Sequence, residues 1–264
     1  MSSSLIDRIF RLFCKKKILV LSGGWFRGLY SVWILKWLEE LWIDKDIEAV
    51  FGVSIWAIVG WCRCSGMKAK DIYELALSLS IDKFYGKEIL KKSGGFLVNR
   101  KIKSLIDENI CASFEDLNKK LYVWVVDTNT AKYKLFEQWD LHTIILGSMS
   151  IPAVFPPVEY EDNLFVDGGL LNNFPVDIAK QIYPHNEIIW VALDKFQENQ
   201  KINTFWDNLS VCYDILMRSK LMDNLKLVDI LFCRELDIPV LSLDKKKMKE
   251  AYELWHKDCI ERFK

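Results

Sequence analysis

Short apolar runs alternate with longer amphipathic runs along most of this 264-residue chain. The runs with the length and content of buried strands are 18–21, 47–51, 121–127, 164–166 and 188–193. The runs with apolar residues at helical spacing are 29–41, 55–62, 69–80, 99–109 and 141–149, and two more helical stretches close the chain. This alternation predicts an α/β fold, a three-layer α/β/α sandwich with a mainly parallel central sheet covered on both faces.

Composition restricts the class of protein further. We expect a single domain over residues 17–264, because no repeat or low-complexity linker interrupts it and 51% apolar residues suffice for one core. A net charge of zero gives no general attraction to nucleic acid, so no nucleic-acid partner is expected. No apolar run is long enough to span a bilayer. Seven scattered cysteines favour reduced thiols and a cytoplasmic location.

The first 16 residues form a separate basic and amphipathic tail. Residues 5–13 carry apolar groups at helical spacing, with Arg8 and Arg11 between them, and three lysines follow at 15–17. This pattern fits peripheral contact with the inner face of a membrane through residues 5–17, and it fits equally a helix packed on the domain or a frayed tail. The apolar core is too short and too interrupted by charge for a signal peptide.

A glycine-rich loop follows the first predicted strand. This loop contains Gly23, Gly24, Trp25, Arg27 and Gly28, and Trp25 is a bulky residue where glycine is expected. Backbone N–H groups of such a loop can stabilise the oxyanion that forms during acyl transfer.

Ser54 is the candidate nucleophile. Gly52 to Trp56 stand between a predicted strand and an apolar helix, where a strained turn exposes the serine oxygen and the helix N-terminus favours negative charge. An indole at position 56 should block this turn or force it open, because a small residue normally stands there.

A serine hydroxyl needs a base, and Asp167 is our candidate. It leaves a predicted strand into the Gly168-Gly169 turn. The chain has only three histidines, at 142, 185 and 256, and none has a neighbourhood that indicates catalysis. A triad of Ser54, Asp167 and His256 is possible in chain order, but His256 lies in a charged helical run, so a Ser54–Asp167 dyad is favoured.

These residues together resemble the patatin-like phospholipase family, from residue 17 to about 189. The matching motifs, in order, are Gly23–Gly28 for Gly-Gly-Gly-x-Arg-Gly, Gly52–Trp56 for Gly-x-Ser-x-Gly, 147–157 for Ala-Ser-x-x-x-Pro-x-x-Phe-Pro-Pro with one register shift, and 167–169 for Asp-Gly-Gly or Asp-Gly-Ala.

The resemblance implies a serine-dependent lipid acyl hydrolase of the phospholipase A or esterase type, which acts through an acyl-enzyme on a phospholipid or another acyl ester. It implies no metal and no organic cofactor. Arg27 would brace the oxyanion loop or meet an anionic head group, although an ordinary surface ion pair is its plain alternative. Substrate head group and acyl length are left open.

Eleven tryptophans stand beside only 12 glycines, whereas a chain of this length normally has roughly 18 glycines. Several stand where glycine is expected, namely Trp25, Trp42, Trp56, Trp139 and Trp255. Some lineages read the codon UGA as glycine, and translation of that codon as tryptophan would produce this exchange. We hypothesise such a misread codon. The alternative is a tryptophan-rich, catalytically impaired relative that binds lipid or a partner.

A dinucleotide-binding site is an alternative interpretation of the glycine-rich loop. With glycine at position 25, residues 23–28 would spell Gly-x-Gly-x-x-Gly between a strand and a helix, and Glu48 follows 20 residues after Gly28. This reading leaves Ser54 and Asp167 without a role, so it ranks below the hydrolase.

Overall fold

The computed structural model describes residues 15–22, 32–78, 113–192, 202–218 and 220–233, and in addition 246, 249, 250 and 252. The strands are β1 (Lys17–Leu21), β2 (Ile47–Gly52), β3 (Lys120–Asp127), β4 (Lys132–Phe136), β5 (Val158–Tyr160), β6 (Asn163–Asp167), β7 (Glu187–Ala192) and β8 (Ile230–Cys233). The α-helices are α2 (Val32–Glu40), α3 (Ile55–Cys64), α4 (Ala69–Ser78), α6 (Leu141–Ser148), α7 (Gly169–Asn172), α8 (Val176–Ile182), α9 (Phe205–Met217) and α10 (Leu221–Leu225). A short 3-10 helix, Ile43–Asp46, precedes β2.

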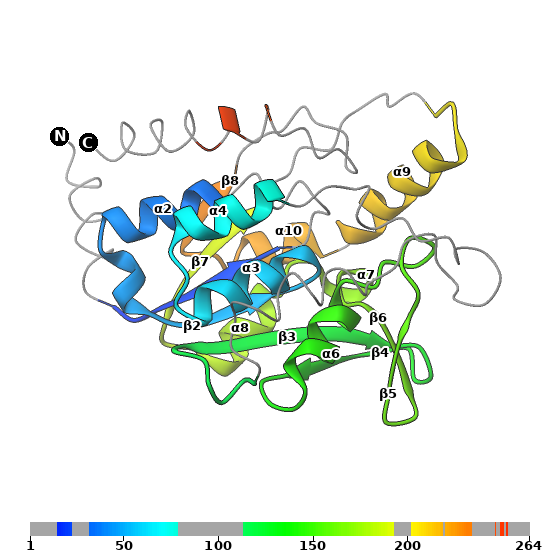
Figure 1. Cartoon of the computed structure of the whole chain (residues 1–264), viewed down its shortest axis with the longest axis horizontal. Coiled ribbons are helices and arrows are strands. Elements are labelled where there is room, and N and C mark those ends of the chain that lie inside the picture. Colours follow the sequence, from blue (N-terminus) through cyan, green and yellow to red (C-terminus); the bar gives the residue numbers. More distant parts are fainter. Residues whose placement is uncertain are drawn as a thin grey trace.

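All of these strands belong to one sheet, shown in Figure 1, with the order β5-β6-β3-β2-β1-β7-β8 and with β4 paired to β3. Five neighbouring strands, in the order β3, β2, β1, β7 and β8, run parallel. The three others, β4, β5 and β6, pair in antiparallel fashion. The prediction of a mainly parallel sheet is therefore confirmed, with an antiparallel extension at one side that the sequence did not indicate.

Helices cover the sheet on both faces, as expected for a three-layer sandwich. Alternate residues of the central strands point to opposite faces, so that Leu19 and Leu21 join one apolar cluster and Ile18 and Val20 join the other. The first cluster packs against α2, α3, α4, α6 and α9, and the second packs against α8 and α10. Because both faces are covered, β1 is buried along its whole length.

β4 and β5 were missed because their sequences lack a continuous apolar run. β4 reads Lys-Tyr-Lys-Leu-Phe and begins with two exposed residues, and β5 has three residues, none of them fully buried. Residues 151–157 contain no helix, as the prolines predicted. The predicted helix at 99–109 lies outside the described residues.

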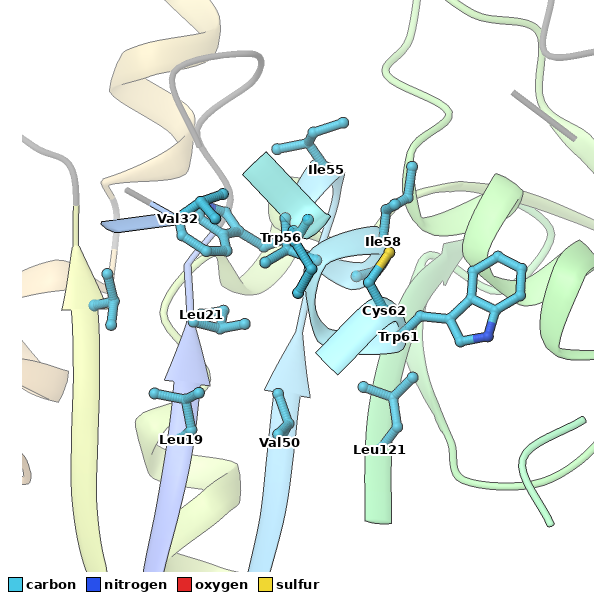
Figure 2. Close-up of a cluster of buried hydrophobic side chains, with 14 of the residues drawn as sticks. Leu19, Leu21, Val32, Val50, Ile55, Trp56, Ile58, Trp61, Cys62 and Leu121 are labelled. Atoms are coloured by element: carbon cyan, nitrogen blue, oxygen red, sulfur yellow. The ribbon is translucent and has the colours of Figure 1, made fainter. Parts of the chain in front are cut away.

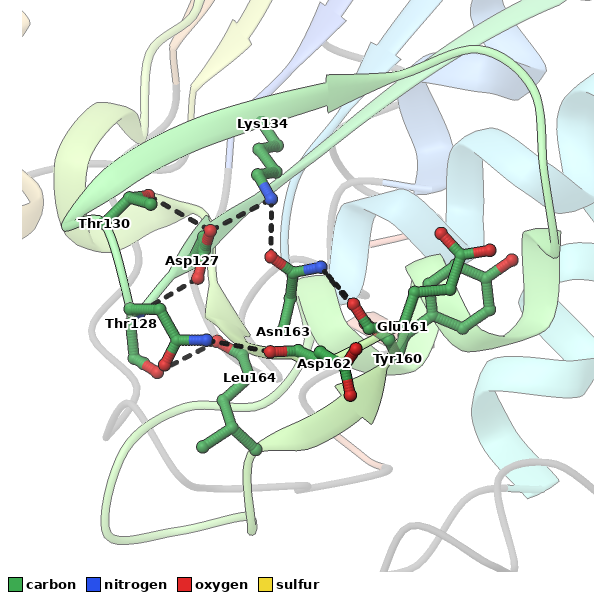
Figure 3. A network of polar contacts seen from close by, with 10 residues as sticks. Asp127, Thr128, Thr130, Lys134, Tyr160, Glu161, Asp162, Asn163 and Leu164 are labelled. Carbon is green, nitrogen blue, oxygen red and sulfur yellow. Dashed lines mark hydrogen bonds and ion pairs between the residues drawn. The ribbon is translucent and has the colours of Figure 1, made fainter.

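A polar network joins the two antiparallel hairpins beside β3 (Figure 3). Lys134 Nζ donates to Asp127 Oδ2 at 2.9 Å and to Asn163 Oδ1 at 2.8 Å. The Lys134 ammonium holds the pKa of Asp127 below its ordinary value. The Asp127 carboxylate also accepts from the Asn129 amide and the Thr130 hydroxyl. This network fixes β6, the strand that carries Asp167, against the end of β3.

Candidate active site

Ser54 lies between β2 and α3 in a strained backbone conformation. Its φ is 59° and its ψ is −138°, a combination that residues other than glycine rarely adopt. Hydrogen bonds from Trp56 N to Val53 O (3.1 Å) and from Ala57 N to Ser54 O (2.9 Å) close the turn. This strand–serine–helix turn has the geometry of a nucleophile elbow.

Gly52 makes this turn possible because the helix returns directly over it. A Cβ atom at position 52 would lie 2.8 Å from Trp56 O and 2.9 Å from Ala57 Cα. Both are backbone atoms, so a side chain at position 52 would push α3 away from β2.

The expectation that an indole at position 56 would block the turn is wrong in this structure. Trp56 lies in the first turn of α3 with its ring fully buried in the cluster that contains Leu21 and Val32 (Figure 2). The crowded position of the turn is Gly52, whereas the Trp56 side chain leaves the helix toward the core. Trp56 Nε1 is buried and has no hydrogen-bond partner, so the indole fits the space but its polar atom is unsatisfied.

Asp167 is the last residue of β6 and is fully buried. Its Oδ1 atom accepts from the Gly169 amide at 2.7 Å, and its backbone N donates to Ser150 O at 2.9 Å. Its Oδ2 atom is buried and accepts no hydrogen bond. One carboxylate oxygen is thus held by the turn, and the other is left without a partner.

Burial raises the pKa of Asp167 to about 7, and the Ser54 side chain and the Gly169 amide partly offset this effect. The Ser54 side chain therefore lies close enough to Asp167 to lower its pKa, although Oδ2 of Asp167 accepts no hydrogen bond. Catalytic hydrogen bonds are often long in unliganded proteins and tighten when substrate binds. A carboxylate with a pKa near 7 can accept a proton at neutral pH.

The strand register explains how Ser54 and Asp167 meet. Val123 of β3 pairs with Gly52 of β2 and with β4, so β2 and β4 lie on opposite edges of β3. Val125 pairs with Asp167 of β6 and also with β4, so β6 lies on the same edge of β3 as β2. β2 and β6 therefore run toward one another along one edge, and Ser54 and Asp167 lie where they meet.

The glycines after Asp167 let the turn approach β3. A Cβ atom at Gly168 would lie 2.4 Å from the carbonyl oxygen of Trp124, so only glycine fits there. A Cβ atom at Gly169 would lie 2.5 Å from Met217 Cε, the flexible end of a side chain from α9. The predicted base turn is thus packed between β3 and α9.

The predicted oxyanion-loop residues, Gly23, Gly24, Trp25, Arg27 and Gly28, lie outside the described residues. Leu21 at the end of β1 pairs with Gly52 at the end of β2. The segment that contains these residues therefore begins beside the Ser54 turn.

The described histidines lie away from this turn. His142 is in the first turn of α6, at the opposite end from Ser148, and its ring packs edge-on against Trp61 with centroids 4.9 Å apart. His185 lies in the exposed turn before β7, at the amino ends of the parallel strands. His256 lies outside the described residues.

The position of Glu48 contradicts the dinucleotide-binding reading. In that class of site the acidic residue lies at the carboxyl end of the second strand, where it binds the ribose. Glu48 is the second residue of β2, is exposed, and accepts from Asn186 Nδ2 at 3.0 Å in the turn before β7. It therefore lies at the opposite end of the parallel strands from Leu21, the last residue of β1.

Ser148 belongs to this site, although its sequence context indicated only the proline segment that follows. It is fully buried, and its Oγ accepts from the backbone N of Ser54 at 3.0 Å. A contact between residues 94 positions apart leaves no local sequence signal.

The part of the chain that the structure describes contains neither a metal-binding cluster nor a membrane-spanning helix. No three His, Cys, Asp or Glu side chains there lie close enough together to hold a metal ion. No helix there is both long and apolar enough to cross a membrane.

Comparison with known structures supports the fold. VipD from Legionella pneumophila superimposes with a TM-score of 0.65 and 14% identity over 94% of this chain and 67% of VipD. ExoU from Pseudomonas aeruginosa, crystallised with SpcU, gives a TM-score of 0.53 and 12% identity over 94% of this chain and 53% of ExoU. At these identities the likeness concerns the fold alone.

Two curated relatives are similar to most of this chain. The probable lipid hydrolase 463L of Invertebrate iridescent virus 6 is 30% identical over 192 residues, which are 65% of each chain. Patatin-like phospholipase domain-containing protein 6 of Mus musculus is 27% identical over 205 residues, 73% of this chain and 14% of that protein. The chain thus spans just under two thirds of the viral relative and a small part of the mouse protein.

The family model for patatin-like phospholipase matches residues 19–180, which include β1, the Ser54 turn, Ser148 and Asp167. The match covers more than half of the chain. The chain therefore belongs to the patatin-like phospholipase family.

Proposed function

We propose that this protein is a lipid acyl hydrolase of the phospholipase A or esterase type, with Ser54 as nucleophile and Asp167 as general base. The observation that carries the proposal is that two energetically unfavourable features lie side by side. A serine with φ of 59° lies beside a buried aspartate whose Oδ2 accepts no hydrogen bond. Strain and unpaired buried charge persist where function requires them.

In the first half of the reaction, Asp167 takes the hydroxyl proton of Ser54 as Oγ attacks the ester carbonyl. The carbonyl electron pair moves onto oxygen, and the α3 N-terminus favours the negative charge that develops. The tetrahedral intermediate collapses, the C–O bond to the alcohol breaks, and Asp167 returns the proton to the leaving oxygen. The acyl group remains on Ser54.

In the second half, Asp167 takes a proton from water as the water attacks the acyl-enzyme carbonyl. Collapse of the second intermediate releases the fatty acid and returns the proton to Ser54. The amides of Gly23, Gly24 and Trp25 are our candidates for the oxyanion donors, each of which typically contributes about 3 kcal/mol of transition-state stabilisation. Arg27 is expected to brace this loop. The proposed reaction needs neither metal nor organic cofactor.

The proposal is tested by hydrolysis of p-nitrophenyl butyrate and of phosphatidylcholine vesicles. Wild-type protein should hydrolyse both, and Ser54→Ala and Asp167→Asn should each lose roughly 1,000-fold or more in kcat/KM. Ser65→Ala, at the other end of α3, is the matched control and should keep full activity. An inactive wild-type protein that still binds vesicles would favour the non-catalytic alternative.

We also propose peripheral membrane contact through residues 5–16 at the inner face of the membrane. Lys17 is removed from the predicted contact because it begins β1, is fully buried, and donates to Lys15 O at 2.6 Å. Cosedimentation with phosphatidylglycerol vesicles should weaken in Lys15→Glu/Lys16→Glu and stay unchanged with phosphatidylcholine vesicles. Equal binding of both proteins to both vesicles would argue against this contact.

A further inference from the structure

Ser148 connects the Ser54 turn to the sheet. It is the last residue of α6 and is fully buried. Its Oγ accepts from Ser54 N at 3.0 Å and donates to the carbonyl oxygen of Trp124 in β3 at 2.9 Å. One hydroxyl thus uses its donor and one acceptor site to join the elbow to the strand beneath it.

The position of Trp124 shows why this connection matters. Trp124 lies in β3 between Val123, which pairs with the end of β2, and Val125, which pairs with the end of β6. Its carbonyl is therefore level with the point where the two strands approach each other. The Ser148 hydroxyl donates to this carbonyl between the end of β2 and the end of β6.

The conformation of Ser54 requires such a partner. Ser54 precedes the first residue of α3, and its buried N–H finds its acceptor in Ser148. A buried backbone N–H without a partner is costly, so the Ser148 Oγ favours the strained φ over relaxed conformations.

The same short segment also holds Asp167. The carbonyl of Ser150 accepts from Asp167 N at 2.9 Å. At Gly147, a Cβ atom would lie 3.0 Å from Phe165 Cβ and 3.3 Å from Val125 Cγ1, so α6 packs closely on β6 and β3. Residues 147–150 therefore contact the backbone of both Ser54 and Asp167.

We propose that Ser148 is a positioning residue for acyl transfer, which holds the Ser54 backbone so that its Oγ faces Oδ2 of Asp167. The inference rests on the proposed function for its catalytic consequence, and on the two hydrogen bonds for its structural part. Loss of the Oγ should let the turn relax and increase the distance between nucleophile and base. A misplacement of about 1 Å can cost roughly 100-fold in rate.

The kinetic test compares Ser148→Ala with Ser148→Thr and with Ser65→Ala, using p-nitrophenyl butyrate and thermal melting. Ser148→Ala should lose roughly 10- to 100-fold in kcat while KM stays within about twofold, because the substrate site is intact. Ser148→Thr keeps the hydroxyl and should recover most of the kcat. Ser65 Oγ is buried without a partner at the far end of α3, so Ser65→Ala should keep the wild-type kcat.

Two results would overturn the proposal. One is a folded Ser148→Ala protein with kcat within twofold of wild type. The other is an equal loss in Ser148→Thr, which would assign the effect to packing rather than to the hydroxyl. If Ser148→Ala does not fold, Ser148→Cys takes its place, because sulfur fills the space but accepts hydrogen bonds weakly.

A second readout separates this proposal from the proposed function. Hydrogen exchange of the Ser54 amide should be slow in wild type and at least about tenfold faster in Ser148→Ala, whether or not the protein hydrolyses esters. An inactive wild-type protein with this difference would contradict the hydrolase and support the positioning role. Equal exchange in both proteins would contradict the positioning role alone.

Discussion

At the scale of single residues, the site combines features that reduce stability. Ser54 has a φ of 59°, and Asp167 is fully buried with one oxygen that accepts no hydrogen bond. Both features cost free energy in the folded protein. Their occurrence side by side is the pattern expected of a reactive site rather than of a structural one.

The pKa of Asp167 predicts the pH dependence of the reaction. Burial raises this pKa to about 7, and only the ionised carboxylate can accept the Ser54 proton. The value of kcat/KM should therefore rise with pH and level off above about 7. Hydrolysis of p-nitrophenyl butyrate between pH 5 and 9 measures this, and a rate independent of pH from 6 to 8 would contradict the assignment of Asp167.

The same shift predicts that Asp167→Asn stabilises the protein at high pH. A raised folded-state pKa means that the folded state binds the proton more tightly than the unfolded state, whose pKa is near 3.8. This contribution is complete below about pH 4 and is lost as the pH rises through about 7. The stability of Asp167→Asn relative to wild type should increase by about 4 kcal/mol between pH 4 and pH 8.

Urea unfolding at both pH values measures this difference. An equal stability difference at pH 4 and pH 8 would show that Asp167 has an ordinary pKa.

The tryptophans also make a prediction at this scale. Trp42 has a φ of 61° and Trp139 a φ of 93°, conformations that favour glycine, and both are exposed. Trp124, in contrast, is fully buried and its Nε1 donates to Asn172 O at 2.9 Å. Trp139→Gly should therefore stabilise the protein by up to about 1 kcal/mol, whereas Trp124→Gly should destabilise it by at least about 3 kcal/mol.

Peptide mass spectrometry of protein from its native cells tests the misread-codon hypothesis directly. Glycine at positions 42 and 139 is the expected result. Tryptophan at both would show that the chain tolerates the strain.

At the scale of elements, the sequence predicted the strands and helices that a local apolar or amphipathic pattern determines. The buried strands β1, β2 and β3 and the helices α3 and α4 have continuous apolar or amphipathic runs, and the structure has them within a few residues of the expected bounds. β8 and α8 were not predicted. Their formation depends on neighbours far away in the chain, such as the pairing of β8 with β7.

The candidate site was predictable to the same extent. Ser54 and Asp167 stand in local motifs, each at the end of a predicted strand. The fit of Trp56 into the core and the contact of Ser148 with Ser54 arise from packing between distant segments, which periodicity and motifs do not report.

The Ser54 turn makes a prediction about two glycines near α3. At Gly52 a Cβ atom would meet backbone atoms at 2.8 and 2.9 Å, whereas at Gly60 it would meet side-chain atoms of Leu121 and Val50 at 3.1 and 3.2 Å. Side chains can shift and the helix backbone cannot. Gly52→Ala should cost about 1–3 kcal/mol of stability and most of the activity, and Gly60→Ala less than about 1 kcal/mol.

Urea unfolding and ester hydrolysis of the two variants check this prediction. Equal effects of both substitutions would contradict the role of Gly52 in the turn.

At the scale of the whole molecule, α9 completes the site although it lies beyond residues 19–180. Tyr213 and Met217, one turn apart on α9, are both buried, and Met217 packs against Gly169 beside Asp167. The negative charge of Asp167 raises the pKa of Tyr213 further, after burial itself. The burial of Asp167 thus depends in part on a helix distant in sequence.

Truncation of the Met217 side chain should change the pH dependence of kcat/KM. Met217→Ala leaves a cavity beside the base turn, so it should cost about 2–5 kcal/mol of stability and lower the pKa of Asp167 as water enters. The pH at which kcat/KM is half-maximal should then fall below about 7. Leu216→Ala, on the exposed face of α9, is the control and should change neither quantity.

Covalent labelling with a fluorophosphonate tests the central claim most directly, since this reagent reacts with activated serines. The account predicts that peptide mass spectrometry finds the label on Ser54, in the peptide between Lys45 and Arg63, and that Asp167→Asn prevents labelling while Ser65→Ala does not. A label on another residue, or none on folded wild-type protein, would contradict the assignment of Ser54 and Asp167 as the reacting pair.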